Sequence, residues 1–133
     1  MTVAVCMRVT IASPRFLVSC LMALVELNAE LYAARENLGA PWSLVWVPDQ
    51  LETCDASGCR FADTSTLIDV VELSRLGYGS CGPLSCAYAS YAFVRARARD
   101  VAIELIPDVE DAWHVVAHAN GRVLDPQQIG ART

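Results

Sequence analysis

The chain has 133 residues, of which 54% are apolar, and its 15 acidic and 10 basic side chains give a formal net charge of −5. This length is enough for one compact domain with a buried core and too short for two, so we expect a single domain over residues 1–133. The acidic balance and the lack of a basic stripe alternating with aromatic residues disfavour nucleic-acid binding.

The first 39 residues contain a strand pattern followed by a helix pattern. Residues 3–11 alternate between larger apolar and other side chains, which is typical of a strand. Ser13 and Pro14 then form an N-cap and a first-turn proline, so we expect a long core helix over residues 15–38 that ends at Gly39. One face of this helix carries Leu17, Leu21, Leu24, Leu31 and Leu38.

The beginning of that helix also resembles a secretory signal. Its apolar run, residues 16–25, is too short to cross a membrane, Glu26 interrupts it, and the helical pattern continues beyond it. We therefore favour a core helix, no membrane partner and a cytoplasmic location, with association with a virion or particle as the alternative.

The middle of the chain has the weakest patterns. Residues 42–47 indicate a strand that Pro48 ends, and residues 63–66 resemble a helix start. Between them, Cys54 and Cys59 border a polar turn, where they can form a disulfide or half of a zinc site. No second Cys/His pair has suitable spacing, so we expect no metal, and free thiols are the default in a reducing cytoplasm.

Cys81 lies in a glycine-rich turn, Gly-Tyr-Gly-Ser-Cys-Gly-Pro at residues 77–83, which runs into a helical pattern. Ser80 or Gly82 can serve as N-cap, and a proline suits the first turn. Cys81 is thus expected at the positive end of a helix, where a thiol has a depressed pKa and free N–H groups can receive an oxyanion. The competing interpretation is a small buried cysteine that packs a tight turn. Cys86, one turn further along the same helix and without the glycine-rich approach, is expected to be a core cysteine.

A hairpin near the end of the chain brings a histidine and a carboxylate together. Residues 113–119 have a strand pattern, and Asn-Gly at residues 120–121 predicts a type I′ turn. The resulting register places His114 and Asp125 on one face as diagonal neighbours, with Cβ atoms roughly 7–8 Å apart. A slip of one residue would separate them, and an ordinary hairpin ended by Asp-Pro is the competing interpretation. His118 shares the face but sits beside the turn, so His114 is preferred.

Together these segments resemble the transglutaminase-like superfamily of papain-related cysteine enzymes, and most of all its small bacterial and phage-associated members. The shared features are a Gly-x-Gly-x-Cys turn opening a helix, a Trp-His-Val-Val strand and Asn-Gly-Arg-Val-Leu-Asp-Pro, over residues 66–130. The resemblance implies an α+β fold with a papain-like core, in which the nucleophile helix packs on an antiparallel sheet. It also implies that Cys81 is the nucleophile, His114 the general base and acid, and Asp125 the orienting carboxylate. Gly82 and Pro83 depart from the acidic residues that small relatives often carry there.

The expected function is thiol-dependent acyl transfer at a peptide or side-chain amide of a protein or peptide substrate, as in a protease or a transglutaminase, without a cofactor. Trp42, Trp46 and Tyr78 are the candidates for the groove wall or a second oxyanion donor. A C39-type peptidase is an alternative on the basis of Cys-Gly-Pro, although the glutamine usual in that family is missing from residues 71–80. The other alternative is a non-catalytic structural or interaction protein of a phage or particle that retains the fold.

Overall fold

The structure is a computed structural model that describes residues 13–107 and 113–131; the strand expected over residues 3–11 lies outside them. Helix α1 (Pro14–Ala34) begins as expected, because the Ser13 hydroxyl accepts the N–H of Phe16 at 3.4 Å. It ends four residues before the expected position. The guanidinium of Arg95 donates to the carbonyl oxygens of Tyr32 and Arg35, at 3.1 and 2.8 Å. These carbonyl groups therefore have hydrogen-bond donors although the helix does not continue for another turn.

One face of helix α1 is buried in the core. By length and composition it is apolar enough to cross a membrane. Its buried side chains are Leu21, Leu24, Val25, Asn28 and Tyr32, and this side packs along the central helix α3 (Cys81–Val94). The Asn28 side chain also accepts the N–H of Val70 at 2.9 Å, which fixes α1 against the segment that leads to α3.

The strand expected over residues 42–47 is mostly absent. A 3-10 turn, η1 (Pro41–Ser43), comes first, because Pro41 fixes the backbone and its carbonyl accepts the N–H of Leu44 at 3.1 Å. Only β1 (Val45–Trp46) is extended, and it pairs in parallel with β4 (Tyr78–Gly79), just before α3.

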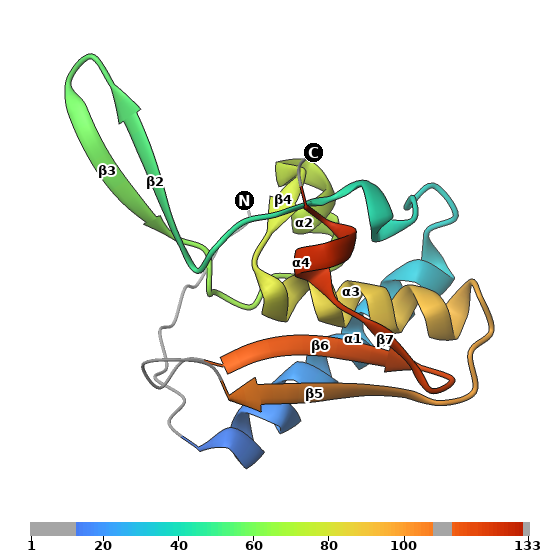
Figure 1. Ribbon diagram of the computed structural model, residues 1–133. Helices are drawn as coiled ribbons and strands as arrows, with labels where there is room; N and C mark the ends of the chain where they lie inside the picture. The colour runs from blue at the N-terminus through green and yellow to red at the C-terminus, as the bar shows by residue number, and fades with distance from the viewer. Residues whose placement is uncertain (1–12, 108–112, 132–133) are drawn as a thin grey trace, which may run out of the picture.

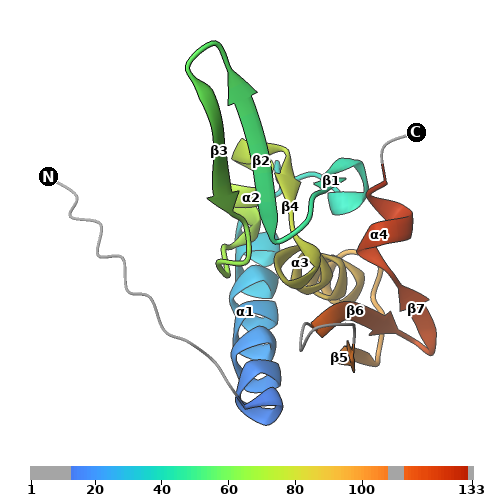
Figure 2. The ribbon, with the colours of Figure 1, turned by 60° about the vertical axis from the view of Figure 1, so that its left-hand side comes forward.

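Strands β2 (Gln50–Asp55) and β3 (Gly58–Asp63) form a hairpin that projects from the rest of the protein (Figures 1 and 2). Cys54 and Cys59 are cross-strand partners, and a disulfide joins them. The expectation of free thiols is therefore wrong in this structure, because the hairpin register brings the two Cα atoms to 4.0 Å.

Helix α2 (Val70–Leu76) starts later than residues 63–66, since Asp63 belongs to β3. Its N-cap is Asp69, whose carboxylate accepts the N–H of Glu72 at 3.0 Å. The helix ends at Gly77, where a φ of 81° requires the left-handed conformation that glycine adopts without strain.

The second half of the chain forms an antiparallel sheet in the order β5 (Val101–Pro107), β6 (Trp113–Ala119) and β7 (Arg122–Leu124). Asn120 and Gly121 have φ values of 51° and 79°, and Ala119 pairs with Arg122, so the predicted hairpin and its register are confirmed. A short helix, α4 (Pro126–Ile129), follows.

Helix α3 lies between α1 on one side and β6, β7 and α4 on the other (Figure 2). Most of its residues are buried, and the Ser85 hydroxyl donates to the carbonyl of Val115 at 2.9 Å across the interface with the sheet. The protein thus has a mixed α+β fold, in which the helix that begins at Cys81 packs on an antiparallel sheet.

Candidate active site

His114 and Asp125 are joined by a hydrogen bond of 2.8 Å between Nε2 and Oδ1. His114 is at the start of β6, and Asp125 follows β7 and caps helix α4, where Oδ1 also accepts the N–H of Gln127 at 3.0 Å. Their side chains are 16% and 22% exposed, so water screens the pair only partly. The predicted contact is confirmed, because the hairpin register holds as far as the last residue before Asp125.

Cys81 is the first residue of α3, and its N-cap is Ser80. The Ser80 hydroxyl does not cap the helix but donates to the carbonyl of Thr64 at 2.7 Å. The backbone N–H groups of Val115 on β6 and of Gly82 and Cys81 at the helix start lower the pKa of the Cys81 thiol, so they lie near its sulfur. The sulfur thus lies against the backbone of the residue that follows His114 in β6.

Burial raises the pKa of the Cys81 thiol, which is in a residue only 8% exposed, and the Asp49 carboxylate raises it further. The N–H groups of Val115 and Gly82 lower this pKa, but by less than burial raises it. The expectation of a depressed pKa is thus wrong in this structure, because loss of water outweighs the helix N-terminus. Cys81 rests as a thiol, and its activation requires a base.

The imidazole of His114 is held at one of its two ring nitrogens. Its Nε2 is used by Asp125, which leaves Nδ1 available to take a proton. Over residues 13–107 and 113–131, no hydrogen bond joins Cys81 to His114. In this arrangement the thiol lies near backbone N–H groups, while the histidine and the carboxylate are already paired.

Trp42 packs on two tyrosines of α3. Its ring packs on Tyr88 and Tyr91, with ring centroids 5.0 and 5.7 Å apart, and these tyrosines lie about two and three turns along α3 from the cysteine. The expectation that Trp42 lines a groove at the site stays a prediction.

Trp46 and Tyr78 flank the segment that leads to Cys81. Trp46 pairs with Gly79, and its N–H donates to the carbonyl of Gly130 at 2.8 Å, so this half-buried residue joins β1, β4 and the end of α4. Tyr78 is also half-buried. The Glu72 carboxylate, and to a smaller extent the Tyr78 phenol, raise the pKa of Arg75 on α2, which places this phenol near the exposed guanidinium.

Two acidic residues near the site were missed by sequence reasoning. Asp49 lies at the base of the β2–β3 hairpin, where its carbonyl accepts the N–H of Thr64 at 2.7 Å. No local pattern indicates its proximity to Cys81. The Glu104 carboxylate is 2.8 Å from Nε2 of His118. The alternation of apolar residues in β5 could have predicted this strand, and with it the position of Glu104. Both histidines thus have a carboxylate partner, and the preference for His114 stays a prediction.

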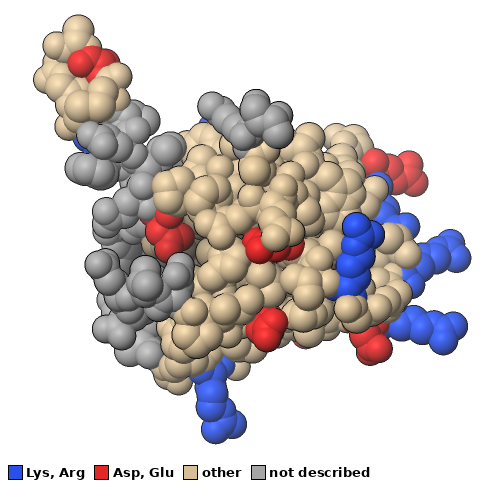
Figure 3. Space-filling model, in the orientation of Figure 1, with Lys and Arg blue, Asp and Glu red and all other residues tan. Residues whose placement is uncertain are grey.

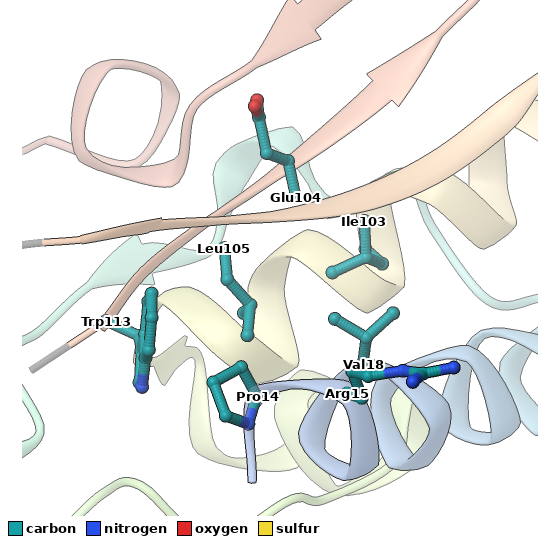
Figure 4. Close-up of a pocket in the computed structure, with 7 residues that line it drawn as sticks. All are labelled: Pro14, Arg15, Val18, Ile103, Glu104, Leu105 and Trp113. Atoms are coloured by element: carbon teal, nitrogen blue, oxygen red, sulfur yellow. The ribbon is translucent and has the colours of Figure 1, made fainter.

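A separate groove of about 470 Å³ lies between the first turn of α1 and strand β5 (Figure 4). It is lined by Pro14, Arg15, Val18, Ile103, Glu104, Leu105 and Trp113. The groove includes none of the three proposed catalytic residues, although Trp113 directly precedes His114.

Basic side chains do not gather at the site. On the face in Figure 3, most of them lie at the end where α3 runs into β5, whereas Cys81 is at the opposite end of α3. Among the residues that the structure describes, no three His, Cys, Asp or Glu side chains come together in a group that would hold a metal ion.

No family model, no curated protein and no solved structure matches this chain. The chemistry of the site is therefore inferred from its own residues and their geometry.

Proposed function

We propose that this protein is a thiol-dependent acyl-transfer enzyme that acts on a peptide or side-chain amide, with Cys81 as nucleophile, His114 as general base and acid, and Asp125 as orienting carboxylate. The observation that carries the proposal is the 2.8 Å bond between His114 Nε2 and Asp125 Oδ1. It fixes the imidazole ring and leaves Nδ1 to receive the thiol proton.

The fold supports the same assignment. The cysteine is at the start of a helix packed on the strand that carries the histidine, and the carboxylate follows the neighbouring strand. This is the arrangement that a papain-like core of the transglutaminase-like superfamily would require, and we include that core in the proposal.

In the first step, the thiol proton moves to Nδ1 of His114 while the sulfur forms a bond to the substrate carbonyl carbon. The carbonyl oxygen becomes an oxyanion, and the N–H groups of Cys81 and Gly82, which lie near the thiol at rest, are its proposed donors. The C–N bond then breaks as His114 returns the proton to the leaving amine, and an acyl thioester remains on Cys81. Water completes hydrolysis, and an amine completes transamidation.

The Asp125 carboxylate stabilises the imidazolium that forms in this step. Its own position is set by the N–H of Gln127, so the first turn of α4 orients the whole histidine–carboxylate pair. This support explains why Asp125 comes immediately before the proline that starts α4.

A trapping experiment tests the proposal. The parent protein and the variants Cys81→Ala, Cys86→Ala and His114→Ala are incubated with a peptidyl nitrile, and adducts are detected by intact mass. We expect one adduct on the parent and on Cys86→Ala, none on Cys81→Ala, and slower formation on His114→Ala. An adduct that persists in Cys81→Ala would contradict the assignment.

The second candidate function is that of a non-catalytic structural or interaction protein of a phage or particle. The observation that favours it is the low exposure of Cys81, together with its raised pKa. In that case no adduct forms on the folded parent, and iodoacetamide labels the half-buried Cys20 before Cys81.

A further inference from the structure

The hydroxyl of Tyr88 is a buried polar group without a partner. Tyr88 is completely buried on α3, and within the described part of the chain its Oη atom makes no hydrogen bond. The ring of Trp42 lies against it, with centroids 5.0 Å apart, and restricts where the phenol can move. A buried donor of this kind is costly unless it finds an acceptor nearby.

Asp125 is a charged acceptor on the neighbouring helix, because it is the N-cap of α4 and α4 contacts α3. Burial raises the pKa of the Tyr88 hydroxyl, and the Asp125 carboxylate raises it further, so the carboxylate lies within electrostatic range and the phenol stays protonated as a donor. Oδ1 of Asp125 already accepts from both His114 and Gln127. Oδ2 makes no hydrogen bond with the residues that the structure describes, so it is available to a third donor.

Tyr88 lies on the same face of helix α3 as Cys81. It follows Cys81 by seven residues, which is about two helical turns, so both residues lie on one face of α3. Side chains on a helix lean toward its N-terminus, which is the end that carries Cys81. Helix α3 also contacts α4, whose N-cap is Asp125 (Figure 2).

We propose that Tyr88 is a positioning residue, whose hydroxyl donates to Oδ2 of Asp125 in the working enzyme and thereby holds the carboxylate that orients His114. A small rotation of the carboxylate or the phenol closes this bond. The role of the pair rests on the proposed function, whereas the contact between Tyr88 and Asp125 does not.

A double-mutant cycle tests the role. The rate of Cys81 alkylation by iodoacetamide at pH 7 is measured for the parent, Tyr88→Phe, Asp125→Asn and the double variant. In the parent, Tyr88→Phe should slow alkylation roughly three- to tenfold. In the Asp125→Asn background the same substitution should leave the rate almost unchanged, because the carboxylate is then gone. Equal slowing in both backgrounds, or none in the parent, would overturn the proposal.

Tyr32→Phe is the matched control. Tyr32 also has a buried hydroxyl without a hydrogen-bond partner among the described residues, but it lies on α1 beside Tyr91 and Arg95. Removal of its hydroxyl should leave the alkylation rate within about twofold of the parent in either background. A rate change equal to that of Tyr88→Phe would mean that loss of any buried hydroxyl disturbs the core, which overturns the specific role.

A spectroscopic measurement separates the contact from the chemistry. In the parent and in Asp125→Asn, the ¹³Cζ resonances of Tyr88 and Tyr32 are compared by NMR. The Tyr88 resonance should move and the Tyr32 resonance should not. An unmoved Tyr88 resonance overturns the contact. If it moves while Cys81 proves unreactive in the parent, the proposed function fails and the contact stands.

Discussion

The Ser80 hydroxyl donates to the carbonyl oxygen of Thr64 at 2.7 Å and ties the residue before Cys81 to the base of the β2–β3 hairpin. Thr64 is held in turn by Asp49, whose carbonyl accepts its N–H, and by Pro48, whose carbonyl accepts its hydroxyl. The start of α3 and the base of the hairpin are therefore one hydrogen-bonded unit. This unit explains why a helix N-cap serine does not cap its own helix.

Ser80→Ala should destabilise the protein by about 1–3 kcal/mol, because it leaves the Thr64 carbonyl without its buried donor. Urea unfolding followed by circular dichroism measures the change. Ser74→Ala is the control, since its hydroxyl bonds only within α2, to the carbonyl of Val70, and about 0.5 kcal/mol or less is expected. An equal decrease in the free energy of unfolding of the two variants would show that the bond to Thr64 stabilises the protein no more than the bond within α2.

Asp49→Asn should accelerate alkylation of Cys81. The carboxylate raises the pKa of the thiol, so its neutralisation lowers that pKa and increases the thiolate fraction between pH 7 and the thiol pKa. The rate should rise roughly two- to fivefold at pH 8. Asp55→Asn, at the far end of the same hairpin, serves as the control and should leave the rate unchanged.

Sequence and structure agree best where the decisive interaction is local. Asn120 and Gly121 dictate a turn, the turn dictates the register, and the register brings Asp125 to His114 within eleven residues of chain. The start of α1 was predictable for the same reason, since the Ser-Pro pair at residues 13–14 defines a helix N-terminus without help from distant residues.

The expectations that failed depend on distant contacts. The pKa of Cys81 is set by burial and by Asp49, 32 positions earlier, and neither is visible in the glycine-rich turn. Helix α1 ends where Arg95, 60 residues after Arg35, binds its carbonyls. The Cys54–Cys59 disulfide was one of two sequence-based alternatives to free thiols, and the cross-strand register that brings the two cysteines together was not visible in the sequence.

Stability should fall at alkaline pH because of two buried thiols. Burial raises the pKa of both Cys86 and Cys81 above the unfolded value of about 8.5. The folded state therefore binds more protons than the unfolded state above that pH. The resulting stabilisation is fully present below pH 8.5 and is lost as pH rises, by at most about 1.4 kcal/mol per pH unit for each thiol.

Cys86→Ala tests this pH dependence. The variant should lose about 1–2 kcal/mol at pH 7, since the sulfur fills core space and its thiol bonds the carbonyl of Leu21 at 3.3 Å. Between pH 8.5 and pH 10, its free energy of unfolding should fall less steeply than that of the parent. Parallel curves from urea unfolding across this range would mean that Cys86 does not take part.

The disulfide should stabilise the projecting hairpin and leave the rest of the protein unaffected. It closes a short loop, Cys54 and Cys59 being five positions apart, for which chain entropy gives about 2 kcal/mol at most. In a Cys54→Ser/Cys59→Ser double variant, limited proteolysis should cut within β2 and β3 several times faster than in the parent. The main urea transition should shift little, because β2 and β3 pair with each other and α3 with α1 and β6 form the core. A double variant that loses its core transition, or a hairpin cut no faster than before, would show that the hairpin is an integral part of the core.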